Sequence, residues 1–152
     1  MNKIFKRTAY LLFIVIAACG YKPLLQNNYP FSINSLTLSG DEKVNKVLNN
    51  RLNSLIKNKK EINYDVQIIN ELNKKTISKD SKGDPLIFEI IIDVEINIRS
   101  EDKILLKKKL QKKNSYKNKS DKFELEEFEN TVIKNLSIII VENTIAAMSN
   151  LK

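Results

Sequence analysis

The chain has 152 residues and a formal net charge of +8, from 26 Lys and Arg against 18 Asp and Glu. This length predicts one domain, since a single core usually serves about 100–200 residues. The sequence has no His and one Cys, which excludes His-ligated metal sites, His-based catalytic triads and internal disulfides. With three Gly in all, glycine-rich phosphate-binding loops are excluded as well.

The N-terminus has the parts of an export signal. Basic residues within the first seven positions precede an uncharged, mostly apolar run over residues 9–18, which ends in small residues. This run is too short to cross a bilayer, which needs about 20 residues. We therefore predict a signal peptide over residues 1–18, followed directly by Cys19.

The segment 16–19, Ile-Ala-Ala-Cys, resembles a bacterial lipobox, in which the Cys thiol receives a diacylglycerol and becomes the new N-terminus after cleavage. The alternative is a short hydrophobic helix that carries a buried Cys. Gly20 stands where Asp would mark retention in the inner membrane. We expect a lipid on Cys19, a linker over residues 19–30, and an anchor on the periplasmic side of a Gram-negative outer membrane. No other cofactor and no nucleic-acid partner is expected.

The mature chain begins with a predicted strand and helix. Apolar and polar residues alternate over residues 31–39, which favours a strand. Over residues 41–57, apolar residues recur at three- and four-residue intervals, which predicts an amphipathic helix. Ser39 and Glu42 have the spacing of a capping box at its start.

Two further strands follow. The second begins near Tyr64 and is expected to continue towards Ile77, through a bulge near Leu72. A turn is predicted over residues 79–85 by composition. The third strand carries apolar residues on even positions from 88 to 98 and mostly polar residues on odd ones, which predicts one buried and one wet face.

The fourth strand is predicted from Ile104 onwards, with its apolar residues, Ile104, Leu106 and Leu110, on even positions. If Ile98 pairs with Ile104, carboxylates face lysines across the two strands, and such pairs contribute about 0.2–1 kcal/mol each. The expected pairs are Glu95 with Lys107, Asp93 with Lys109, and Glu89 with Lys113. Lys108 would be the exception, on the apolar face opposite Val94.

The last segment predicts a long helix that opens at Ser120 and Asp121, with acidic residues in its first turns. It extends to Ala146 or Met148, although the apolar run 136–141 leaves a strand open there. The expected buried stripe is Leu125, Phe128, Val132, Leu136 and Ile139.

The predicted order is therefore β-α-β-β-β-α. It indicates an α/β (α+β) fold, a two-layer sandwich with two helices on one face of a four-stranded, mostly antiparallel sheet. No second-domain boundary is visible, so residues 31–152 are predicted to form a single domain.

The start of the mature chain, Cys-Gly-Tyr-Lys-Pro-Leu at 19–24, resembles the lipopolysaccharide-assembly lipoproteins of the LptE family, especially their alphaproteobacterial branch. Ser115 followed by Tyr116, the acidic start of the last helix and the element order also fit. Lys22 departs from the family, where Arg often stands. The resemblance implies an outer-membrane lipoprotein that plugs and helps assemble the LptD β-barrel and assists delivery of lipopolysaccharide to the cell surface.

The resemblance also implies lipopolysaccharide as a ligand, whose phosphates lysines would meet as point charges. The candidate residues are Arg99, Lys107, Lys109, Lys112 and Lys113. Pairing with carboxylates across the sheet explains most of these lysines without any ligand.

Other functions stay open at this point. The chain could be another outer-membrane assembly or envelope-scaffold lipoprotein, which binds proteins and not lipopolysaccharide. An enzyme is not expected, because no nucleophile motif is present and the adjacent Glu126 and Glu127 would face different ways on a helix.

Overall fold

The structure is a computed structural model and describes residues 29–57, 60–101 and 103–151. The predicted signal peptide, Cys19 and most of the predicted linker lie outside the described residues.

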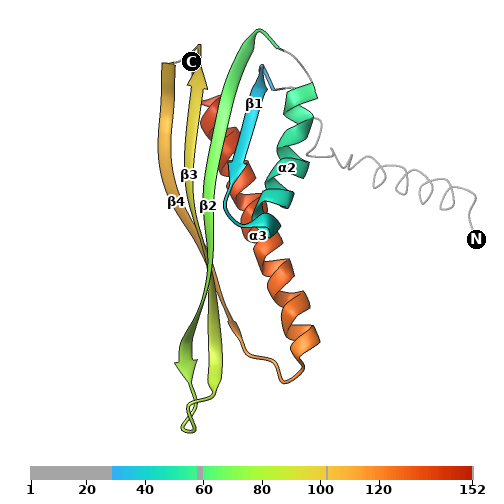
Figure 1. Cartoon of the computed structure of the whole chain (residues 1–152), viewed down its shortest axis with the longest axis vertical. Coiled ribbons are helices and arrows are strands. Elements are labelled where there is room, and N and C mark those ends of the chain that lie inside the picture. The colour runs from blue at the N-terminus through green and yellow to red at the C-terminus, as the bar shows by residue number, and fades with distance from the viewer. Residues whose placement is uncertain (1–28, 58–59, 102, 152) are drawn as a thin grey trace, which may run out of the picture.

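The described chain forms two helices and four strands in the predicted order, β-α-β-β-β-α. Their bounds are β1 Phe31–Ser39, α2 Glu42–Lys57, β2 Ile62–Lys79, β3 Pro85–Ser100, β4 Lys103–Lys117 and α3 Lys122–Ser149. The strands form one sheet in the order β1-β2-β3-β4, with β1 parallel to β2 and the other neighbours antiparallel. Both helices cover the same face of this sheet, so the predicted fold class is confirmed (Figure 1).

The core lies between the helices and the sheet face that they cover, which we call the inner face. In β3, the even-numbered residues Ile90, Ile92, Val94, Ile96 and Ile98 are at most 3% exposed. On the inner side of α2, Val44, Leu48 and Leu52 are fully buried in the same core cluster. The predicted alternation of β3 is therefore confirmed, since successive side chains of a strand point to opposite faces.

Asp41 caps α2. Its Oδ1 accepts a hydrogen bond from the backbone N–H of Val44 at 3.0 Å. The predicted capping box of Ser39 and Glu42 is therefore wrong. The reason is Gly40, whose φ of 110° turns the chain after Ser39, so that the helix begins later and the cap falls on Asp41.

A buried side chain, Asn70 of β2, holds the junction between β1 and α2. Its Nδ2 donates to the carbonyl of Ser39 at 3.0 Å and to Oδ1 of Asn45 at 2.7 Å, and its Oδ1 accepts from the N–H of Asp41 at 3.0 Å. Because these bonds satisfy the amide, Asn70 can occupy an inner-face position with only 4% exposure.

The two ends of the sheet differ because β1 pairs with only part of β2. β1 pairs only with the first part of β2, up to Ile69, and the rest of β2 pairs with β3 alone in a long hairpin at the bottom of Figure 1. We call this end the lower end, and the opposite end, where β1 begins and α3 ends, the upper end. The bulge expected near Leu72 is wrong, because Leu72 pairs regularly with Ile92. The irregularity lies at Ile77, beside the predicted turn, which is confirmed.

The turn between β3 and β4 sets a register other than the predicted one. Arg99 pairs with Ile104, and one extra residue of β4, Leu105, then brings Leu106 opposite Ile98. The predicted pairing of Ile98 with Ile104 is therefore wrong, because the turn shifts the register by one residue and the bulge shifts it by one more. Ile104 precedes the bulge and is 57% exposed instead of buried.

A two-residue shift keeps every later side chain of β4 on its predicted face. Leu106 and Leu110 still pack against the core. Lys108 lies opposite Ile96 instead of Val94, and it is exposed because β4 is the edge of the sheet.

α3 is one continuous helix, which excludes the strand left open for residues 136–141. Asp121 caps it, as predicted, and Val132 and Leu136 are buried as predicted. The stripe then continues through Ile140, and the prediction for Ile139 is wrong, since it is 39% exposed. The reason is that α3 packs against α2 as well as the sheet, which centres its contact face one residue later. Phe128 of the predicted stripe is also exposed.

Among the described helices, α3 alone is long and apolar enough, by length and composition, to cross a membrane. In the apolar window that meets this test, 44% is buried inside the molecule. Such partial burial is also found in the core helix of a globular domain.

At the lower end, five residues that we call the lower clamp hold the start of α3 on the sheet. Glu129 of α3 accepts a hydrogen bond from the Tyr116 hydroxyl at 2.7 Å and pairs with Lys74 Nζ at 2.5 Å. The Lys74 ammonium lies 4.2 Å from the centre of the Phe88 ring. Tyr116 packs between Phe88 and Phe128, with ring centres 5.9 and 5.5 Å apart.

Candidate functional site: the outer face of the sheet

The sheet face away from the helices, which we call the outer face, is mostly polar. The odd-numbered residues of β3 and β4 lie on it, as the alternation predicted. β3 supplies acidic and amide side chains in the middle of the sheet, and β4 supplies mainly basic ones at its edge. The principal residues are Glu89, Asp93, Glu95 and Asn97 of β3, with Lys107, Lys109, Gln111 and Lys113 of β4.

Glu95 is the centre of a charge network on this face. Its Oε1 lies 3.0 Å from Lys107 Nζ and its Oε2 lies 3.4 Å from Lys109 Nζ. The Lys107 ammonium and, after it, the Asn97 amide donate hydrogen bonds that lower the pKa of Glu95. The predicted pair with Lys107 is therefore present, although Lys109 is the residue directly opposite.

The other two predicted ion pairs have different outcomes. Glu89 pairs with Lys113 at 3.8 Å, as predicted, but diagonally. The pair of Asp93 with Lys109 is wrong, because the shifted register places Gln111 opposite Asp93. The Gln111 amide donates to Asp93 at 2.7 Å instead.

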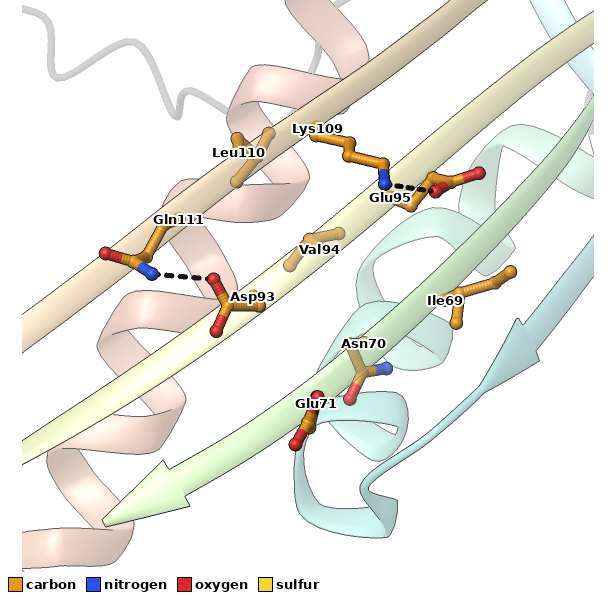
Figure 2. Close-up of a pocket in the computed structure, with 9 residues that line it drawn as sticks. All are labelled: Ile69, Asn70, Glu71, Asp93, Val94, Glu95, Lys109, Leu110 and Gln111. Atoms are coloured by element: carbon orange, nitrogen blue, oxygen red, sulfur yellow. Dashed lines mark hydrogen bonds and ion pairs between the residues drawn. The ribbon is translucent and has the colours of Figure 1, made fainter. Parts of the chain in front are cut away.

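An open hollow of 590 Å³ lies over the middle of the outer face, between β2 and β4. Figure 2 shows the residues that line it. The contacts of Lys109 with Glu95 and of Gln111 with Asp93 lie along it. Ile69 of β2 adds a large apolar side chain that is 42% exposed. The hollow therefore combines fixed polar groups with apolar surface, a composition suited to another macromolecular surface.

A smaller hollow of 200 Å³ lies nearer β1. There Asp65 accepts hydrogen bonds from the Ser35 hydroxyl at 2.6 Å and the Asn34 amide at 2.9 Å, and these bonds lower its pKa. Arg99 lies directly opposite Asp65 across the strands. The side-chain oxygen of Asn97 is buried here without a hydrogen-bond partner among the described residues.

The predicted lipopolysaccharide-binding residues do not form one cluster. Arg99, Lys107, Lys109 and Lys113 lie on the outer face. Lys112 lies on the inner-face side of β4, opposite Ile92, and is separated from the others by the sheet itself. A single ligand on the outer face therefore meets four of the five at most.

The outer face can form hydrogen bonds and ion pairs with a surface laid across it. Its lysines share carboxylates instead of converging on one point, so their pull on a phosphate is reduced. In residues 29–57, 60–101 and 103–151, no group of three or more His, Cys, Asp or Glu could hold a metal ion.

Sequence reasoning missed the amides of this face. Gln111 interrupts the lysines at the odd positions of β4. With the correct register, this interruption would have placed an amide opposite Asp93. The bonds from Asn34 and Ser35 to Asp65 depend on a register shift in β1 after Ile33, and no sequence pattern announces it.

No protein-family model and no curated protein matches the chain. Solved structures are similar to it. Rare lipoprotein B from Shewanella oneidensis has 19% sequence identity and a TM-score of 0.56, over 78% of this chain and 98% of that one. A minor lipoprotein from Acinetobacter baumannii has 17% identity and a TM-score of 0.49, over 79% of this chain and 93% of that one. The first likeness establishes that the domain shares its fold with a bacterial lipoprotein.

Proposed function

We propose that this protein is an outer-membrane lipoprotein, held by a lipid on Cys19, that plugs and helps assemble an LptD-type β-barrel and assists delivery of lipopolysaccharide. The observation that carries the proposal is the likeness in fold to rare lipoprotein B over 98% of that chain, together with a segment at 16–19 that resembles a lipobox.

The outer face supports an interior position in a barrel. A barrel wide enough to hold a folded domain has a polar, water-filled lumen. The face of the sheet that carries Glu95 and its lysines is polar and already paired internally. It therefore stays soluble before assembly and meets a polar wall without leaving buried charges unpaired.

The first experiment purifies the full chain from its own envelope in detergent and identifies what comes with it. We expect a stoichiometric complex with a large β-barrel protein, and acylation of Cys19 by mass spectrometry. The Cys19→Ser variant is the control, and it should lose both the lipid and most of the complex. A chain recovered without any barrel protein would reject the proposed partner.

Direct binding of lipopolysaccharide needs its own test. The double variant Lys107→Met with Lys109→Met should weaken binding to lipopolysaccharide micelles if the outer face contacts the phosphates. Lys108→Met removes one exposed lysine between them on the other side of β4, and it should leave binding unchanged. Equal losses in both proteins would show a nonspecific charge effect.

The second candidate is a lipoprotein that binds envelope proteins and no lipopolysaccharide. The pairing of Lys107, Lys109 and Lys113 with carboxylates favours it, because it explains these lysines without a ligand. A stable complex with protein partners and no binding of lipopolysaccharide would support it.

A further inference from the structure

A groove of 410 Å³ lies at the upper end, on the side of α3. Its lining residues are Tyr29, Glu142, Ile145, Ala146, Ser149 and Asn150. Glu142 is the one charged residue in this lining, and Ala146 is exposed. The apolar surface continues along the helix to Ile139. This stretch of α3 therefore offers an apolar groove that no described segment covers.

The chain enters the fold at the wall of this groove. The Tyr29 ring stacks on Phe31, with ring centres 5.3 Å apart, and Phe31 packs against Tyr64 at 5.7 Å. The Tyr64 hydroxyl donates to the carbonyl of Leu151 at 3.2 Å, just beyond α3. These contacts hold Tyr29, the first described residue, at the wall of the groove.

We propose that the segment before Tyr29 lies in this groove, with Leu24 and Leu25 packed on α3 near Ile145 and Ala146. Four extended residues, from Tyr29 back to Leu25, span up to about 13 Å. The groove spans about 12 Å along α3 from Asn150 to Glu142, at about 1.5 Å per helical residue. The length therefore matches.

The chemistry of the segment matches as well. Leu24 and Leu25 are adjacent apolar residues in an otherwise polar stretch that ends in Gln26, Asn27 and Asn28. Burying them on an apolar helix face removes hydrocarbon from water. An acidic or strongly basic occupant would gain nothing comparable from a groove with a single carboxylate.

The consequence concerns the tether and rests on the proposed lipidation of Cys19. A free linker from Cys19 to Tyr29 could extend about 34 Å, whereas the stretch from Cys19 to a docked Leu25 could extend only about 20 Å. Docking would therefore hold the upper end near the membrane and point the lower end away from it.

The test traps the contact with a disulfide in the full-length lipoprotein. Leu25→Cys with Ala146→Cys should form a disulfide under mild oxidation about ten-fold faster than Leu25→Cys with Asn135→Cys, because docking raises the effective thiol concentration. Asn135 is also exposed on α3, about 16 Å further along its axis. Cys19 is the only native Cys, and its lipid leaves no other free thiol.

A third variant separates docking from mere proximity. Adding Leu24→Asp to the Leu25/Ala146 cysteine pair should reduce the trapping rate to that of the Asn135 pair, and it changes no residue of the described fold. Equal rates for the two cysteine pairs, or no effect of Leu24→Asp, would overturn the proposal. A third result would also overturn it. If no disulfide forms, and Ala146→Cys is protected from a water-soluble thiol reagent only when membranes are present, then the membrane or a partner fills the groove.

This test needs neither a barrel nor lipopolysaccharide. Its failure therefore leaves the proposed partner untouched, and mass spectrometry of the same sample reports whether Cys19 is acylated.

Discussion

Gly40 lies so close to the backbone of Asn70 that a Cβ added at Gly40 would collide with the Asn70 carbonyl group. Gly40 also has a φ of 110°, a conformation that side chains disfavour. The Asn70 side chain binds the same turn through Ser39 and Asp41. Backbone contact and side-chain hydrogen bonds thus join β2 to the β1–α2 junction at one point.

Gly40→Ala should therefore lower the free energy of unfolding by about 3 kcal/mol, because strain at φ and a backbone collision act together. Urea unfolding of the purified protein measures this. Gly83→Ala is the matched control, since Gly83 has a φ of 91° but nothing within 4 Å of an added Cβ. It should cost about 1 kcal/mol. Equal losses would mean that the collision with Asn70 is relieved.

Tyr116→Phe tests the lower clamp. The variant removes the hydrogen bond to Glu129 and should cost about 1–2 kcal/mol at neutral pH, measured by urea unfolding. Ser115→Ala, next to it and exposed, should cost much less. An equal loss in both variants would show that the bond to Glu129 contributes little.

Tyr116 also predicts an alkaline effect. Burial, and then the bond to the Glu129 carboxylate, raises the pKa of Tyr116 above its ordinary 10.0. Because the pKa of Tyr116 is raised in the folded protein, its stabilising contribution is complete below pH 10.0. This contribution is lost as the pH rises through the folded-state pKa. Tyr116→Phe should therefore lose less stability than the wild type above pH 10.0, in unfolding curves recorded over that range.

The charge network on the outer face predicts an order of effects. Lys107→Met should raise the pKa of Glu95 towards its ordinary value more than Lys109→Met does, because the Lys107 bond is the largest cause of the lowered pKa. NMR titration of the Glu95 side-chain carboxyl carbon measures both. The reverse order would mean that Lys109, directly opposite, dominates in solution.

Asp65 predicts a loss of stability in acid. The pKa of Asp65 is lower in the folded protein than in the unfolded chain. Asp65 therefore stabilises the fold above its unfolded-state pKa, and this stabilisation is lost as the pH falls through its folded-state pKa. Ser35→Ala removes the first cause and should raise the pKa of Asp65, so that stability depends less on pH in this window. NMR titration of Asp65 and acid unfolding curves check both parts. An unchanged Asp65 titration would contradict the role of the Ser35 hydroxyl.

Patterns with a fixed period predicted their elements well. The even positions of β3 and the apolar intervals of α2 depend only on strand and helix geometry, and the structure confirms both. The acidic first turns and Asp121 likewise placed the start of α3. These signals are local, so no knowledge of the rest of the fold was needed.

Predictions that depended on long-range contacts were less successful. The register of β4 depended on the turn after Ser100 and on the bulge at Leu105, and each moved the later pairings by one residue. Helical periodicity alone does not distinguish Ile139 from Ile140 as the buried residue. Only the packing of α2 on α3 decides which of them is buried. The buried hydrogen bonds of Asn70 were not predicted, because its partners lie 25 or more positions away in the sequence.

The uneven length of β1 and β2 divides the molecule into regions of different local stability. Beyond Ile69, the hairpin of β2 and β3 has no β1 partner, and the first two turns of α3 there are almost wholly exposed. Regions with little buried apolar surface open at a lower free energy than the whole protein. Amide hydrogens of the hairpin beyond the lower clamp should therefore exchange with solvent by a partial opening, while those around Ile96 exchange only on complete unfolding.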